Sequence, residues 1–66
     1  MDFMLVFTFT TLAGLVDMEE LLIEGIDSKQ MCEALAGQAI STWAQLAEVQ
    51  LAEVTSIDCM PVGEEA

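Results

Sequence analysis

Residues 25–47 read GIDSKQMCEALAGQAISTWAQLA, and this stretch predicts two short helices joined by a tight link. The first of these helices is predicted to begin at Asp27 or Ser28. Either residue can act as its N-cap, because both side chains accept a hydrogen bond from the first turn. Apolar residues then recur at helical spacing. Gly37 is suited to end the helix, since glycine adopts a left-handed C-cap without steric cost.

The flanking segments predict further helices. Asp17 followed by Glu20 has the spacing of a capping box, which indicates a short helix that begins there. Downstream, Ser41 or Thr42 is suited to cap a third helical segment, residues 42–55. The pattern is compatible with one helix or with two short ones over that segment.

The N-terminal stretch, residues 3–16, carries no charge and alternates as a strand does. One face of that strand holds Phe3, Leu5, Phe7 and Phe9. No second strand is apparent, and an unpaired strand edge invites pairing with another chain. We therefore expect residues 3–10 to add to a partner's sheet or to pair with a second copy. The alternative is an apolar arm packed on the helices.

These patterns together predict a mostly α fold. We expect a small helix-hairpin-helix-like bundle of three to four short helices with an N-terminal extended strand. The predicted division is a strand-like arm, residues 1–16, and a helical domain, residues 17–66.

Residues 21–47 resemble the helix-hairpin-helix family, a structural class that includes the C-terminal domain of the bacterial RNA polymerase alpha subunit. The resemblance lies in a leucine-rich start, a Gly-Ile hairpin position and the later run TWAQLA. It implies two hairpin turns, at Gly25, Ile26 and Asp27 and at Pro61, Val62 and Gly63.

The departures from that family concern its nucleic-acid surface. Family hairpins bind a DNA phosphate through backbone amides, helped by basic residues. Here Asp27 occupies the third position of the first hairpin, and Glu64 and Glu65 follow the second. Lys29 is the only cation near either turn. DNA binding is therefore not transferred to this chain.

Composition also disfavours nucleic acid as a ligand. Twelve acidic residues against one lysine give a net charge of −11. Binding to phosphate backbones depends on Lys and Arg, which release condensed counterions. A basic protein partner, or mimicry of the charge of a nucleic acid, is compatible with this balance. The simplest alternative is that the acid keeps a 55% hydrophobic chain in solution.

Residue types that carry catalysis or bind metals are scarce. The chain has no His, Tyr or Arg, so acid–base chemistry would depend on carboxylates alone. A zinc site needs about four N or S ligands, and Cys32 and Cys59 are isolated. We expect both cysteines to be reduced, with Cys32 a small core residue. We also expect no cofactor, no metal and no enzymatic activity.

The leading hypothesis is a non-catalytic protein–protein interaction module, such as a small subunit of a larger assembly. Aromatic residues dominate interface energetics. The predicted partner-binding residues are Phe3, Leu5, Phe7, Phe9 and Trp43. For Trp43, a core position is the alternative. A homo-oligomer is compatible with the same apolar strand.

Two other functions follow from the charge and from the resemblance. One is an acidic inhibitor that mimics nucleic-acid charge and blocks a basic enzyme. It predicts a single acidic face made of Asp17, Glu19, Glu20, Glu24 and Glu33. The lesser alternative is weak nucleic-acid binding through the hairpin turns.

The location predicted from the sequence is the cytoplasm. A transmembrane helix needs about 20 apolar residues, and the uncharged run over residues 3–16 is shorter. A signal peptide begins with positive charge, whereas residue 2 is Asp2. We therefore expect neither membrane association nor export.

Overall fold

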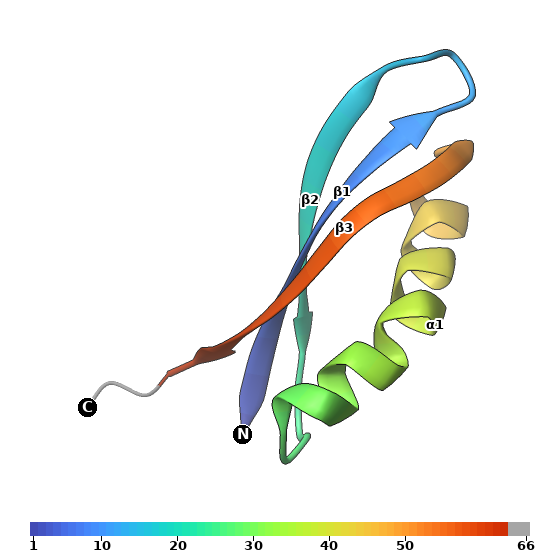
Figure 1. The fold of residues 1–66 in the computed structure, drawn as a ribbon. Coiled ribbons are helices and arrows are strands. Elements are labelled where there is room, and N and C mark those ends of the chain that lie inside the picture. The colour runs from blue at the N-terminus through green and yellow to red at the C-terminus, as the bar shows by residue number, and fades with distance from the viewer. Residues whose placement is uncertain (64–66) are drawn as a thin grey trace.

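The computed structural model describes residues 1–63, which form a three-stranded antiparallel sheet with one helix against one face (Figure 1). The elements in chain order are β1 (Asp2–Thr11), β2 (Val16–Ile23), α1 (Lys29–Ala47) and β3 (Leu51–Val62). The strand order is β2-β1-β3. The predicted mostly α bundle and the helix-hairpin-helix resemblance are therefore wrong.

β1 confirms the strand predicted near the N-terminus. Its burial alternates along its length, and Leu5 and Phe7 are fully buried against α1. The strand is central, however, with β2 along one edge and β3 along the other. Its backbone groups are thus used within the sheet, which leaves no free edge for residues 3–10 to add to another sheet.

β2 occupies the segment predicted as the first helix. The chain turns back over residues 12–15: the Thr11 N–H donates to the Leu15 carbonyl, and Gly14 has a left-handed φ of 88°. Glu, Leu and Met favour helices, but eight residue pairs with β1 outweigh that local preference. The capping-box pattern at Asp17 and Glu20 is therefore not used as a helix start.

β3 replaces the end of the predicted third helix and the predicted second hairpin. Val54, Thr55 and Ile57 are β-branched, and residues of this kind favour pleated, half-buried surfaces. Pro61 lies in the strand opposite Phe3, not in a turn. β3 is an edge strand, where proline is tolerated because its missing N–H can fall on the outer side.

α1 is one helix of 19 residues, longer than predicted. The Ser28 side chain accepts a hydrogen bond from the Met31 N–H at 3.1 Å, which confirms the predicted start. Gly37 and Thr42 lie inside the helix, so the predicted end and second start are wrong. The helix continues because it buries one stripe against the sheet, which consists of Cys32, Ala36, Ile40 and Ala44.

The predicted hairpin turns are absent from residues 1–63. Gly25, Ile26 and Asp27 belong to the link between β2 and α1. Gly25 has a φ of 74° and donates its N–H to the Asp2 carboxylate, while Ile26 is buried in the core. Pro61 and Val62 lie in β3, and Gly63 follows that strand. Glu64 and Glu65 lie outside the described residues.

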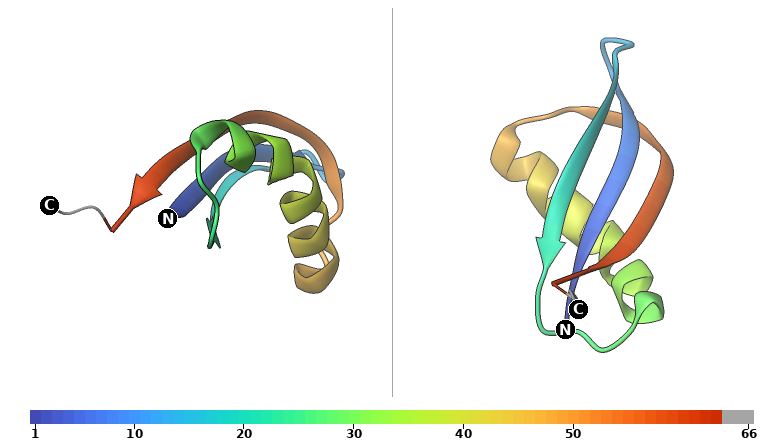
Figure 2. Two further views of the ribbon diagram at one scale, coloured as in Figure 1. Left: turned by 90° about the horizontal axis from the view of Figure 1, so that it is seen from below. Right: turned by 90° about the vertical axis from the view of Figure 1, so that its left-hand side faces the viewer.

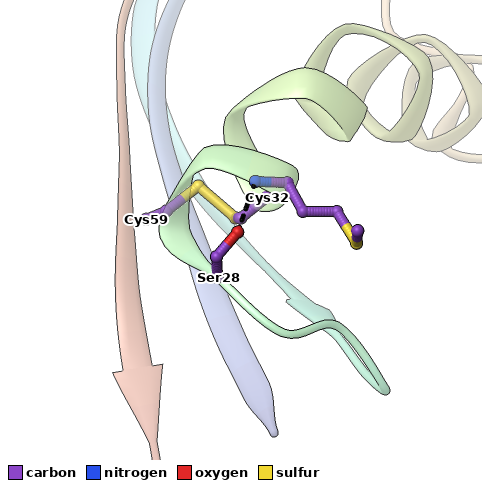
Figure 3. Close-up of a disulfide and its surroundings, with 4 residues drawn as sticks. Ser28, Cys32 and Cys59 are labelled. Atoms are coloured by element: carbon purple, nitrogen blue, oxygen red, sulfur yellow. Dashed lines mark hydrogen bonds between the residues drawn. A yellow bond between two sulfur atoms is a disulfide. The ribbon is translucent and has the colours of Figure 1, made fainter.

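A disulfide between Cys32 and Cys59 ties the first turns of α1 to β3 (Figure 3). Their Cα atoms are 6.3 Å apart, within the range that a disulfide spans. Both residues are buried, so the prediction that Cys32 belongs to the core is confirmed. The prediction that both are reduced is wrong, because the fold brings together cysteines that are 27 residues apart.

Replacing Ser28 by Ala should destabilise the fold by about 1 kcal/mol, because the Met31 N–H loses its capping acceptor. Urea unfolding followed by Trp43 fluorescence measures this loss. The matched control is Ser56→Ala, an exposed serine of β3 whose change should leave the midpoint nearly unaltered. Equal midpoints for the two variants would contradict the capping role.

Candidate functional site

A single helix leaves part of this sheet face uncovered. α1 crosses the strands diagonally, as the right-hand view of Figure 2 shows. Its backbone comes closer to β1 and β3 than to β2. Open grooves therefore remain on both flanks of the helix. We refer to them as the α1–β2 groove and the α1–β3 groove.

The α1–β2 groove is the larger, with a volume of about 620 Å³. Its apolar lining comes from both elements and consists of Leu21, Leu22, Ile23, Leu35, Ala39, Trp43 and Leu46. Leu46 is 81% exposed and Leu35 is 37% exposed. Aliphatic side chains with this much accessible surface are available to a binding partner.

Trp43 forms the inner wall of this groove and is half-buried. Its ring packs edge-on against Phe7, with centroids 5.2 Å apart, and against Phe9, with centroids 5.3 Å apart. Such tilted contacts between aromatic rings are favourable. The core therefore holds Trp43 in place while part of its ring remains accessible from the groove.

Carboxylates lie at both ends of the apolar lining. Glu24 lines the groove where β2 ends. Towards the turn between β1 and β2, Asp17 and Glu19 lie on the same face of β2 as Leu21, since side chains alternate along a strand. The apolar groove is thus bounded by negative charge.

The structure distributes the predicted partner-binding residues unequally. The β1 members, Phe3, Leu5, Phe7 and Phe9, are all buried beneath α1 and form the core. Only Trp43 reaches an accessible surface. Leu35 and Leu46 were missed, although their spacing of 11 residues places both on one helix face, beside the buried stripe.

The acidic residues expected to form one face are divided among several surfaces. Glu19 lies on the helix side of β2, and Glu20 lies on the opposite side of the sheet. Glu33 lines the α1–β3 groove, on the other flank of the helix. This dispersed placement is what we expect for a subunit whose contact surface is apolar.

Two other surfaces are weaker candidates. The α1–β3 groove has a volume of about 430 Å³, and apart from Ile40 its helix wall is made of small or polar residues, including Gly37 and Ser41. The sheet face opposite α1 exposes Met18, Leu22 and Met60, but Val6 there lies between Glu20 and Asp58 on the neighbouring strands. Neither surface presents an aromatic residue.

Residues 1–63 contain no group of three or more His, Cys, Asp or Glu side chains placed to hold a metal ion. Within the same residues, no helix combines the length and the apolar character needed to cross a bilayer.

Comparison of the chain with protein-family models, curated proteins and solved structures gave no match.

Proposed function

We propose that this protein is a non-catalytic protein–protein interaction module, and that it acts as a small subunit which docks through the α1–β2 groove. The observation that carries the proposal is the accessible apolar wall formed by Trp43, Leu35 and Leu46. The cores of protein interfaces are more apolar than the rest of the surface and are enriched in aromatic residues.

The fixed position of Trp43 supports this use of the groove. Association costs free energy when flexible side chains become ordered at the interface. Phe7 and Phe9 already restrict the Trp43 ring from below. A partner that covers the ring therefore gains contact area at little cost in side-chain ordering.

The disulfide bears on the compartment in which the protein acts. Disulfides persist in oxidising environments and are rare in the cytosol. Cys32 and Cys59 are bridged in the folded chain. We therefore propose that the protein acts, or is assembled, in an oxidising compartment, in place of the cytoplasmic location predicted from the sequence.

The placement of the acidic residues gives no support to the alternative of a charge mimic. A mimic needs carboxylates on one face at roughly phosphate spacing, whereas Glu20 and Glu33 lie on different sides of the sheet. The acidic surface has a simpler use in the present proposal, which is to favour basic partners and oppose self-association.

Replacing Leu46 by Gln tests the function. Burying a leucine side chain contributes about 1.5–3 kcal/mol, so the variant should bind its partner roughly ten- to a hundredfold more weakly. The measurement is recovery of the same partner band by tagged full-length protein from source cells, followed by titration. Folding should be unchanged, because Leu46 is 81% exposed.

The matched control is Leu12→Gln, at an exposed leucine in the turn between β1 and β2. It removes the same apolar surface at a site distant from the groove. A partner retained equally by both variants would refute docking at the α1–β2 groove.

A further inference from the structure

β2 is an edge strand whose free side runs beside the groove. The Thr11 N–H donates to the Leu15 carbonyl, so Thr11 and Leu15 are a hydrogen-bonded pair. Hydrogen-bonded and non-hydrogen-bonded pairs then alternate along the β1–β2 ladder. By that alternation, the N–H and C=O groups of Glu20 and Leu22 point away from β1. The Asp17 carboxylate accepts the Met18 N–H at 2.8 Å, so the open part of the edge begins after Met18.

The other edge of the sheet is less suited to accept a strand. The β1 residues that do not bond to β2 bond to β3. By this alternation, the backbone groups of Cys59 and Pro61 point away from β1, towards the outer edge of the sheet. Pro61 has no N–H to donate. Cys59 is also tied to α1 by the disulfide. The free backbone beside an apolar groove is therefore that of β2.

Charge along β2 is arranged in two blocks. Asp17, Glu19 and Glu20 occupy the half nearer the turn, and residues 21–23 are Leu-Leu-Ile. A strand paired with β2 would place its residues directly opposite these side chains, where opposite charges attract and like charges repel. The complementary strand has Lys or Arg opposite the acidic half and apolar residues opposite the other half.

We propose that β2 accepts an extended segment of a basic partner protein as a fourth strand of the sheet. This proposal rests on the proposed function and specifies the partner's chemistry. Apolar side chains of the segment would enter the groove beside Trp43, and its Lys or Arg side chains would face Asp17 and Glu19. Strand addition satisfies the backbone groups of Glu20 and Leu22, which a docked helix would leave without partners.

Charge disfavours a second copy of this chain as the occupant. Parallel pairing of β2 with its own copy would bring the acidic halves of the two strands together. Antiparallel pairing would set the acidic half of each strand opposite the apolar half of the other. Each copy also carries a net charge of −11 with Lys29 as its only cation. Like charges opposed across a strand pair are destabilising, so the occupant must carry positive charge.

The test uses oxidised full-length protein and synthetic eight-residue peptides. Each peptide joins a block of Val and Ile to a block of Arg, and both block orders are made because pairing can be parallel or antiparallel. Readouts are the fluorescence of Trp43, the single tryptophan, and hydrogen exchange at individual amides. We expect one order to bind saturably, shift Trp43 emission and slow exchange at Glu20 and Leu22 at least tenfold. Exchange at Ile57, on the other edge, should not change.

Two controls separate strand addition from simple charge attraction. A peptide N-methylated on the amides that would face β2 keeps its charge and side chains but cannot pair. It should bind at least tenfold more weakly. Glu19→Gln should weaken binding at low salt, whereas Glu53→Gln on β3 should not.

Equal binding of the N-methylated peptide, or no slowing at Glu20 and Leu22 with either block order, would overturn strand addition. Binding of a helical peptide of the same composition in the groove, without protection of the β2 amides, would also overturn it. Loss of the cellular partner on Leu46→Gln would still support the proposed function in these cases. The two failures are therefore distinguishable.

Discussion

Removing the Cys32–Cys59 disulfide is expected to lower the free energy of unfolding by about 3.5 kcal/mol. The bridge closes a loop over 27 residues of sequence, and opening it restores conformational entropy to the unfolded chain. A core of this size rarely supplies more than roughly 3–5 kcal/mol. The double variant Cys32→Ala/Cys59→Ala should therefore be largely unfolded at 37 °C.

Urea unfolding of the oxidised protein and of the double variant measures this loss directly. Reductant should destabilise the wild-type protein by a similar amount and leave the double variant unchanged, which separates the bridge from the packing of the two side chains. Equal stability of the wild-type protein with the bridge formed and with the bridge reduced would show that the bridge contributes nothing.

Replacing Phe7 by Ala should destabilise the fold by about 3–5 kcal/mol. Phe7 is fully buried, and its ring lies against both Phe9 and Trp43. Truncation removes the apolar contact and leaves a cavity at the centre of the core. Because Trp43 loses one of its two supporting rings, its emission in the folded state should also shift. Denaturant unfolding and fluorescence measure the two effects.

Thr8→Ala is the matched control for Phe7, since Thr8 is the next residue of β1 and its side chain lies on the opposite face. Thr8→Ala should lower the free energy of unfolding by less than about 1 kcal/mol. A comparable loss for the two variants would mean that the helix side of β1 is not the main core. Phe7→Leu keeps most of the volume and should cost less than Phe7→Ala.

Features encoded by neighbouring residues were predicted correctly. The alternation of Phe3, Leu5, Phe7 and Phe9 gives β1 and the face that it buries, since a strand has a period of two. The side chain of Ser28 and the backbone of Met31 are close in sequence, and the predicted cap is observed. The contact role of Trp43 stays a prediction, and the structure places this residue in the lining of the α1–β2 groove.

Features that depend on distant residues were not predicted. β2 has the composition of a helix and becomes a strand because β1 supplies its hydrogen-bond partners. β3 pairs with β1 although β2 and the whole of α1 lie between them in the sequence. Gly37 is suited to end a helix, but α1 continues through it because Ala36 and Ile40 are buried against the sheet.

The candidate site also combines features that the sequence shows locally with features that depend on distant residues. The types of residue needed for an interface, an aromatic residue and leucines among many acids, were visible in composition. Their arrangement was not, because the α1–β2 groove requires a strand at residues 16–23 where local preference indicates a helix. The residues first assigned to partner binding in β1 became the core instead.

By itself, the sequence determined the strand β1, the start of the helix, the acidic charge and the absence of His, Tyr and Arg. These properties depend on side chains within a few positions of one another or on composition alone. The tertiary structure decided the two outer strands, the disulfide and the groove. Each of these joins segments distant in the chain, where the free energy of pairing and burial exceeds the local preference of the residues involved.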